Sequence, residues 1–529
     1  MAIPQRRPEG APEPVVAHVE APAAKPALSD GPVFGLLMGL AVLFRAAIFP
    51  FTQNVYGDAV VRTEFAERWL ASPHLITSFK DGVYQFGPLH TYVMALALWL
   101  WHDRAAAGRI ASFIFGVLVL WPTWRVGLRL FGRQGAIWAC LALGLWGMHV
   151  QMSTTAGSEA LALCLFAFAI DGLLQGLDEA RFAPLARAAL FLNLGCAVRY
   201  DLWMYVPLFG LAIALHGKDR VAWVTRAVMF TGLAVVFPLL WMEGNEKAMG
   251  DPLYPVHYID EFHRRWTQDG VAWLGATRFR LWGLVFWPGT LLLTASPLFG
   301  LFSLAGVVAS AVRKHHRMLL LFVAVPTAYF TARTLMLTFS PLARFTVTQL
   351  WLCLFFAYPG IKLVTDRVPR WAGRALIGLV VAVMVLTPAA IAKASYEVDD
   401  GWGNSLKPVS PVTTMPRDQM EVAHWLRDNV PAADGLLLDY DDAYTDVGVA
   451  FFSNLPEERM VRLRWETEGD DVQARVDKLA PAAVILWKGG KLLQHAGVSR
   501  KGDLLDAFGR HYRRARGFAD DKFEVFRAE

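Results

Sequence analysis

Long apolar blocks, separated by short polar stretches, fill the first 393 residues of the chain. Blocks of about 20 apolar residues have the length that crosses a lipid bilayer as a helix. The pattern predicts eleven membrane-spanning segments, at residues 33–51, 88–102, 105–124, 135–150, 156–176, 188–214, 225–243, 283–312, 318–337, 345–362 and 372–392. Because the number is odd, the two ends of this region are expected on opposite sides of the membrane.

The stretch between the first two spans, residues 55–90, predicts an amphipathic helix that lies in the membrane interface. The helix opens at Asp58, and it ends before Pro73 because the residue preceding a proline disfavours helical backbone. Its apolar positions recur every four residues, at Val61, Phe65 and Trp69. Asp58 is therefore expected to be held at the membrane surface between two membrane helices.

A second long stretch, residues 244–282, mixes aromatic residues with His263, Arg264 and Arg265. It is too long for a tight turn and predicts another interfacial helix. Two interpretations stay open for it: a connector that lies on the membrane surface, or a segment that holds an anionic lipid headgroup.

The two ends of the chain differ from its centre. Residues 1–31 are rich in Ala, Pro and Glu and predict a disordered tail. From about residue 394 charged residues become frequent and the pattern is typical of a soluble α/β domain. Helices are expected at 417–429, 469–479 and 500–512, and strands at 435–440, 482–487 and 523–528. The expected fold is a polytopic α-helical membrane protein with a small, Rossmann-like C-terminal domain, which lacks the glycine-rich motifs of nucleotide binding.

Composition supports the membrane assignment, since 55% of the 529 residues are hydrophobic and only 18% are charged. The net charge of +5 is small for this length and forms no basic stripe, so the sequence does not indicate nucleic-acid binding. The four cysteines lie in apolar spans without metal-ligand spacing, which indicates neither a disulfide framework nor a zinc site. They are Cys140, Cys164, Cys196 and Cys353.

Basic clusters predict the orientation of the chain. Clusters at 216–226, 313–317 and 362–374 fall on the same side as the N-terminal tail, which the positive-inside rule makes cytoplasmic. Asp58, the stretch 244–282 and everything after residue 393 then lie outside. One cluster disagrees, because the same count places Arg125, Arg129 and Arg133 at the outer surface.

Asp58 is the strongest candidate for chemistry. A carboxylate at a protected membrane surface suits a general base or a group that orients an acceptor hydroxyl. The alternative is a helix N-cap, a common role for aspartate. Val61 occupies the third helical position, so no capping box favours that alternative.

Five arginines lie inside or at the ends of apolar spans: Arg45, Arg109, Arg199, Arg333 and Arg344. A basic side chain at mid-membrane costs roughly 3 kcal/mol, so several of them imply partners or a polar cavity, with snorkelling as the alternative for some. Arg199 and Asp201 are expected on different helix faces, each with a partner elsewhere. Arg344 is expected near the outer side, where its planar fork suits phosphate oxygens.

A polar interruption between the fourth and fifth spans contains His149, Gln151 and Glu159. It predicts a loop followed by a Ser/Thr-rich helix start, and a cavity wall is the second interpretation.

Seven segments follow one another in an order that is informative as a whole. They are GDAVVRTEFAERWLAS in the first outer stretch, FGPLHTYVMAL, AGRIASFIFGVLVLWPTW, LRLFGRQGAIWACLAL, AVRYDLWMYVP, MGDPLYPVHY in the second outer stretch, and PLARF late in the membrane part. In this order the chain resembles the GT-C superfamily of membrane glycosyltransferases. Within it, the chain is similar to bacterial relatives of protein O-mannosyltransferases and of the transferase that adds aminoarabinose to lipid A.

The resemblance implies an enzyme of the bacterial inner membrane that transfers a sugar from a polyprenyl-phosphate donor to an acceptor on the outer side, with inversion. It implies that Asp58 deprotonates or orients the acceptor hydroxyl, while basic residues neutralise the departing lipid phosphate. The acceptor is a glycan, a lipid or a protein. The residues expected to contact the lipid phosphate and the sugar are Glu159, Arg199, Asp201, His263, Arg264 and Arg344.

Many relatives carry an adjacent acidic pair in the first outer loop, whereas Gly57 and Ala59 flank Asp58 here. The sequence therefore names no metal ligands and leaves a divalent metal open.

Two rival functions remain. A transporter or flippase of lipid-linked sugars would also use buried arginines, although the chain shows no internal repeat and no matched broken helices. A sensor or scaffold whose C-terminal domain does the work would keep its function without Asp58 and lose it without residues 394–529.

Overall fold

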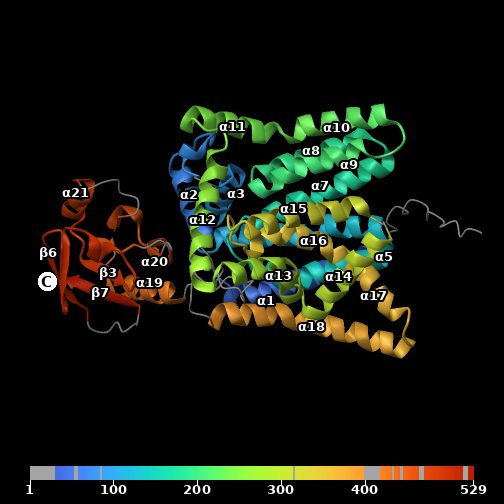
Figure 1. The fold of residues 1–529 in the computed structure, drawn as a ribbon. Coiled ribbons are helices and arrows are strands. Elements are labelled where there is room, and N and C mark those ends of the chain that lie inside the picture. The colour runs from blue at the N-terminus through green and yellow to red at the C-terminus, as the bar shows by residue number, and fades with distance from the viewer. Residues whose placement is uncertain are drawn as a thin grey trace, which may run out of the picture.

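The computed structural model describes residues 30–52, 57–83, 86–313, 316–397, 417–431, 434–440, 445–463, 470–515 and 522–529. Helices up to Glu397 pack into one elongated bundle, and a sheet-containing C-terminal domain lies against one end of it (Figure 1). The mostly helical fold with a C-terminal sheet is as predicted. The predicted tail falls almost wholly outside the described residues, and the predicted domain boundary falls inside the last bundle helix.

The bundle helices follow the chain in order. They are α1 (Gly31–Ile48), α2 (Gly57–Ala71), α3 (Pro88–Trp101), α4 (Ala107–Leu118), α5 (Leu120–Leu145), α6 (Gly147–Met152), α7 (Glu159–Glu179), α8 (Phe182–Cys196), α9 (Tyr205–Ala214), α10 (Arg220–Ala234), α11 (Val236–Met249), α12 (Tyr254–Leu274), α13 (Ala276–Thr294), α14 (Pro297–Val312), α15 (Arg317–Leu335), α16 (Val347–Phe355), α17 (Ala357–Thr365) and α18 (Arg370–Glu397).

Among the described residues, six helical segments are long and apolar enough to cross a membrane, and a seventh is added if the bent pair α10–α11 forms one span. Shorter apolar helices, such as α8 and α14, accompany them. The predicted count of eleven spans stays a prediction. The two predicted interfacial helices correspond to α2, which ends at Ala71 before the Ser-Pro pair, and to α12.

Several predicted spans differ from the helices that form. The predicted span 188–214 divides into α8 and α9, because Arg199 has extended backbone (φ −146°, ψ 135°) and a 3-10 helix follows at Tyr200–Met204. The apolar stretches 105–124 and 135–150 are joined through α5, which is broken at Gly132. A Cβ atom on Gly127 would lie 2.5 Å from the Cα of Ala136, so the chain folds back on itself at this break.

The break at Gly132 predicts a stability effect. Its backbone (φ 67°, ψ −165°) lies in a region that is essentially reserved for glycine, where another residue costs about 1–3 kcal/mol. We expect Gly132→Ala to lower the thermal unfolding midpoint of the detergent-solubilised protein. Gly378→Ala, in the open middle of α18, is the matched control and should be neutral or slightly stabilising. Equal midpoints for Gly132→Ala and wild type would contradict the tight turn.

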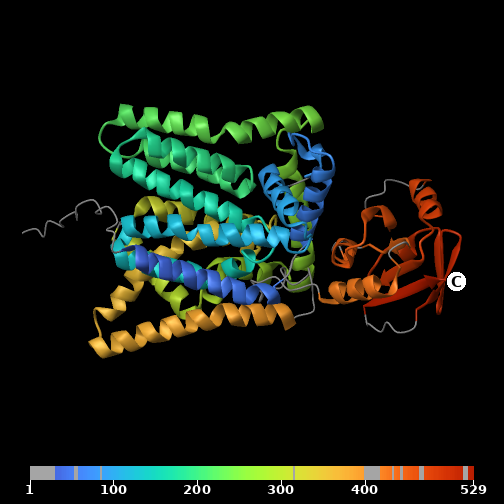
Figure 2. The same cartoon turned by 180° about the vertical axis from the view of Figure 1, so that it is seen from behind.

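The fold-back also corrects the position of the basic cluster at residues 125–133. Arg133 pairs with Asp30 at the start of α1 (3.0 Å), and the ring of Phe131 contacts that of His316 (centroids 4.8 Å apart). The cluster thus lies beside the 313–317 cluster and at the end of the bundle where α1 begins. The prediction that this cluster lies at the end opposite the 313–317 cluster was wrong, because it counted residues 88–102 as a crossing, whereas α3 lies beside α2 at the other end of the bundle (Figures 1 and 2).

Arg45 is fully buried, and its hydrogen bonds stabilise the break between α5 and α6. Its guanidinium donates to the carbonyl oxygens of Leu143 (3.2 Å) and Gly144 (3.0 Å) at the end of α5. It also contacts the His149 ring (2.8 Å) and Ser153 (2.9 Å). Carbonyls at a helix C-terminus carry partial negative charge, so they stabilise this arginine. His149 therefore belongs to the packed interior, as does the buried Gln151 nearby.

The C-terminal domain contains, within its described residues, a seven-stranded sheet in the order β2-β1-β3-β7-β6-β5-β4. The β1, β2 and β3 strands are parallel, and the remaining neighbours are antiparallel. The elements are α19 (Arg417–Asn429), β1 (Leu436–Leu438), α20 (Thr445–Ser453), β2 (Met460–Arg462), α21 (Asp470–Leu479), β3 (Ala483–Trp487), β4 (Val498–Lys501), β5 (Leu504–Ala507), β6 (Arg510–Arg514) and β7 (Phe523–Ala528).

Alternating strand residues build a core on each side of this sheet. Leu436, Leu438 and Ile485 pack with residues of α19 and α20, whereas Leu437 and Val484 pack with residues of α21. This alternation matches the two-sided burial of strands between helices.

The helix predicted at 500–512 is wrong, because strands β4, β5 and β6 form an antiparallel meander there. Gly502 and Gly509 both have positive φ, and each sits in a tight turn between strands. Such turns reverse the chain into hairpins, and Leu505 and Ala507 then share the buried face.

Candidate active site

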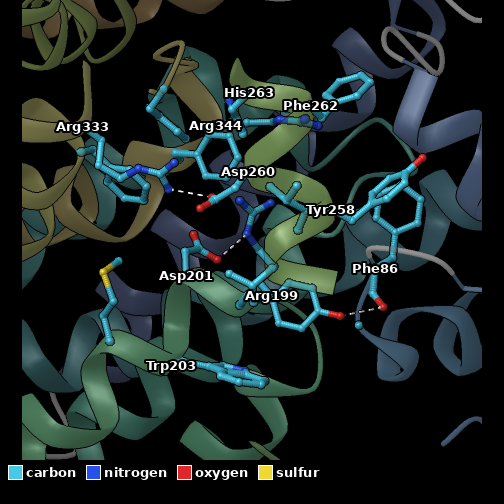
Figure 3. A pocket seen from close by; sticks show the side chains of 18 of the residues that line it. Phe86, Arg199, Asp201, Trp203, Tyr258, Asp260, Phe262, His263, Arg333 and Arg344 are labelled. Carbon is cyan, nitrogen blue, oxygen red and sulfur yellow. Dashed lines mark hydrogen bonds and ion pairs between the residues drawn. The ribbon is translucent and has the colours of Figure 1, made fainter. Parts of the chain in front are cut away.

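A cavity of about 330 Å³ lies at the end of the bundle that faces the C-terminal domain, where α2, α12 and the 3-10 helix Tyr200–Met204 meet (Figure 3). The end of α15 and residues 339–345 complete it. Its acidic and basic lining residues are Asp58, Arg62, Arg199, Asp201, Asp260, His263, Arg333 and Arg344. Aromatic residues form most of the remaining wall. The cavity therefore combines fixed charges with apolar, ring-lined surface.

Asp58 lies in the first turn of α2 and forms an ion pair with Arg344, which comes 286 positions later in the chain. Both side chains line the cavity. The structure thus brings together the two residues that the sequence singled out most strongly. Nothing in the sequence pattern indicated that they contact each other.

Arg199 corrects a second expectation. Its Nε donates to Asp201 (3.0 Å) and its Nη1 donates to Glu159 (2.7 Å). The expectation that Arg199 and Asp201 do not pair assumed α-helical backbone, whereas Arg199 is extended and only Tyr200 begins the 3-10 helix. Glu159 is buried at the start of α7 and contacts this arginine from behind the cavity wall.

Arg333 and Asp260 form a third pair across the cavity (2.8 Å) and connect the end of α15 with α12 (Figure 3). The sequence had marked Arg333 as an arginine at the end of a span, but it had not assigned Asp260 or Arg62 to the site. Both look like ordinary polar positions of amphipathic helices. Asp260 does lie three residues before His263, a spacing that places two residues on one helix face, and this was the available signal.

Aromatic rings hold the arginines by cation–π contact. The guanidinium carbons of Arg199 and Arg344 lie 5.3 Å and 5.6 Å from the centroid of Phe345. That of Arg62 lies 3.8 Å from the centroid of Phe86. A ring contacts the flat face of a guanidinium, whereas carboxylates and phosphates bind along its N–H edge, so the two kinds of contact can coexist.

His263 is buried, and its ring stacks on Phe339 with centroids 4.1 Å apart. Burial, with the nearby charges of Arg344 and Arg333, lowers the pKa of His263 to about 3. The ring is therefore neutral at ordinary pH and contributes a polar aromatic surface. Arg264, the next residue, is exposed and does not line the cavity.

The lowered pKa of His263 predicts a pH effect on stability. The unfolded chain takes up a proton at this residue below about pH 6.5, whereas the folded protein does not, so folding is weakened as the pH falls toward 3. At pH 5 the loss is about 2 kcal/mol. The unfolding midpoint of wild type should therefore drop more between pH 7.5 and pH 5 than that of His263→Gln. Equal decreases of the unfolding midpoint in the two proteins would refute the predicted contribution of His263.

A metal finds no ready ligand set here. Among the described residues no group of three or more His, Cys, Asp or Glu side chains could hold an ion. The carboxylate of Asp58 is directed to an arginine instead. No chemical step is therefore assigned to a metal ion.

Comparison with known proteins identifies the fold. Residues 85–242 match the family model described as dolichyl-phosphate-mannose-protein mannosyltransferase. The solved structure of ArnT from Cupriavidus metallidurans bound to undecaprenyl phosphate superposes with a TM-score of 0.61 at 14% identity, covering 94% of this chain and 98% of ArnT. Its apo state gives a TM-score of 0.57 at 13% identity, with the same coverage.

A more distant match is the archaeal oligosaccharyltransferase AglB from Archaeoglobus fulgidus, in complex with an inhibitory peptide and a dolichol-phosphate. Its TM-score is 0.50 at 14% identity, covering 87% of this chain and 70% of AglB. No curated protein sequence matches the chain significantly. The resemblance seen in the sequence is thus confirmed, and the chain has the fold of the GT-C superfamily of membrane glycosyltransferases.

Proposed function

We propose that this protein transfers a sugar from a polyprenyl-phosphate donor to an acceptor that enters the same cavity. The observation that carries the proposal is the pair Asp58 and Arg344, which places a carboxylate and a guanidinium together in a cavity with three further arginines, Arg62, Arg199 and Arg333. Support also comes from the ArnT structure of the same fold, which holds undecaprenyl phosphate.

The arginines are assigned to the lipid phosphate. The donor is a phosphodiester, and the polyprenyl phosphate released from it is a monoester that leaves readily without an acid. Negative charge grows on the phosphate oxygens as the bond to the sugar breaks. Guanidinium groups stabilise that charge if they are already in place before the reaction. Arg344, with Arg199, has the planar fork that phosphate oxygens prefer.

Asp58 is assigned to the acceptor. Its carboxylate accepts the proton of the acceptor hydroxyl, or orients that hydroxyl, while the oxygen attacks the anomeric carbon. A new bond forms between that carbon and the acceptor oxygen, and the bond to the phosphate oxygen breaks with its electron pair leaving on the lipid phosphate. Attack from the face opposite the leaving group inverts the anomeric configuration.

The resting ion pair has to open for this chemistry. In this structure the carboxylate of Asp58 is paired with the guanidinium of Arg344. A donor phosphate that takes over the guanidinium separates the two, and the carboxylate then becomes available as a base. Glu159, Asp201 and Asp260 are assigned a supporting role, because each pairs with an arginine and fixes its position.

We further propose that the protein lies in a bacterial inner membrane with its cavity on the outer side. The supporting observation is that the basic clusters at 125–133 and 313–317 lie together at the end of the bundle where α1 begins, away from α2 and α12 (Figures 1 and 2). Basic residues gather on the cytoplasmic side of membrane proteins.

The direct test supplies purified protein with a panel of polyprenyl-phosphate sugars and with membrane extract as the source of acceptor. Transfer of labelled sugar from the lipid to an acceptor is expected. The same protein in sealed vesicles tests the rival function, a flippase. Movement of the donor lipid between leaflets, without any transfer, would replace the enzyme with that alternative.

A further inference from the structure

Helix α2, which carries Asp58, contributes both to the cavity and to the contact with the C-terminal domain. Asp58 and Arg62, one turn apart, line the cavity. Another part of the α2 surface packs against the C-terminal domain through a shared apolar cluster. Its members are Val60, Val61, Phe65 and Phe86 from the bundle and Ala423, Val447, Phe451 and Phe452 from α19 and α20. The C-terminal domain therefore touches the site through α2.

A buried ion pair lies at this contact. Glu64 of α2 accepts from Arg462 at the end of β2, with Oε1 to Nη1 at 3.1 Å and Oε2 to Nη2 at 3.5 Å. Each of the two side chains is only 4% exposed. The carboxylate of Asp446, which is fully buried, lies 3.8 Å from Nε of the same arginine. The guanidinium thus joins α2 to α20 and to the sheet.

A second arginine ties the same glutamate to the bundle. Arg104, which follows α3, lies 2.9 Å from Glu67 and 3.7 Å from Glu64. Its guanidinium carbon also lies 4.9 Å from the ring centroid of Phe451 in α20. The charged contact is therefore a network that connects α2, the end of α3 and the C-terminal domain.

This network is suited to fixing the position of α2 relative to the C-terminal domain. A two-pronged arginine–carboxylate contact in a buried place accepts one relative geometry, whereas an apolar contact tolerates sliding. Glu64 is six residues from Asp58, or about 9 Å along the rigid axis of α2. An error in the position of α2 is therefore carried directly to the carboxylate in the cavity.

We propose that Glu64 and Arg462 are positioning residues, through which the C-terminal domain holds Asp58 in its working place opposite Arg344. This inference rests on the proposed function, in which Asp58 acts on the acceptor. The C-terminal domain then belongs to the transfer machinery rather than being an independent appendage.

Charge reversal tests the proposal, using the full chain in detergent or vesicles. Glu64→Arg and Arg462→Glu should each lower kcat by about 10- to 100-fold, as expected for a reacting group displaced by an ångström or less, with a smaller change in KM for the donor. The double variant, which restores opposite charges, should recover part of kcat. Arg513→Glu and Glu529→Arg, an exposed pair at the far edge of the same domain, should change neither constant.

A second readout does not depend on transfer. In a protein with Asp58→Cys and Arg344→Cys, the rate of disulfide formation reports how closely these two positions are held. Adding Glu64→Gln should slow that rate, and Glu529→Gln should not. The four natural cysteines are buried and interfere little.

The outcomes distinguish the positioning role of Glu64 and Arg462 from the proposed sugar transfer. Wild-type kcat in both single variants, or an unchanged disulfide rate with Glu64→Gln, would overturn the positioning role while leaving sugar transfer intact. Failure of the double variant to recover any kcat, in folded protein, would also count against it. If wild type transfers no sugar but the disulfide rate falls as expected, the proposed function fails and the positioning contact stands.

Discussion

Replacing Asp58 by asparagine is expected to lower the rate of sugar transfer by about 10²–10⁴-fold, the usual contribution of a general base. The amide keeps the shape of the side chain, but it has no negative charge and is a very poor proton acceptor. Donor affinity should not fall, because the change also frees Arg344 from its carboxylate partner. Single-turnover transfer at saturating donor measures the first quantity, and binding of labelled donor measures the second.

Asp251→Asn is the matched control for this experiment. Asp251 precedes α12, accepts a hydrogen bond from His257 (2.7 Å) and lies outside the cavity lining. This variant should transfer sugar at the wild-type rate. Equal transfer by Asp58→Asn and wild type would remove Asp58 from the chemistry, while loss of both transfer and donor binding would assign it to the donor instead.

Arg344→Ala is expected to lower kcat by about 10²–10³-fold, which is the usual loss when one preorganised donor to a developing negative charge is removed. Arg344→Lys should lose less, because it keeps the charge but not the planar fork. The measurement is kcat and KM for the donor, taken separately for each variant.

Arg265→Ala serves as control for the removal of an arginine. Arg265 is exposed on α12, pairs with Glu261 and does not line the cavity, so its loss should leave kcat unchanged. A rise in KM with unchanged kcat in Arg344→Ala would show that this arginine binds the donor equally in the ground state and the transition state.

The sequence was most informative where one local pattern decides the structure. Apolar residues every four positions and a Ser-Pro stop were enough to predict α2, and the change of composition after residue 393 was enough to predict a C-terminal sheet. The hydrophobic pattern did not predict the meander β4–β6, because its strands are short and rich in charged residues. The glycines in the turns were the available sign of these strands.

The pairings inside the cavity were beyond the reach of local patterns. Asp58 and Arg344 were each recognised as unusual, yet their contact depends on how distant helices pack. Arg199 and Asp201 were expected apart because helical spacing was assumed for a segment that is extended and then 3-10. Asp260 was overlooked, because an aspartate on an amphipathic helix looks like a solvent-facing residue until its arginine is known.

If transfer proceeds as proposed, the Asp58–Arg344 ion pair also has a kinetic consequence. An acceptor that arrives at the empty protein meets a carboxylate already occupied by a guanidinium, whereas a donor brings the phosphate that displaces it. Substrate addition should then follow a compulsory order, with the lipid-linked sugar first. The spent lipid phosphate, which keeps the group that engages Arg344, should be the last product to leave and should compete with the donor for the free enzyme.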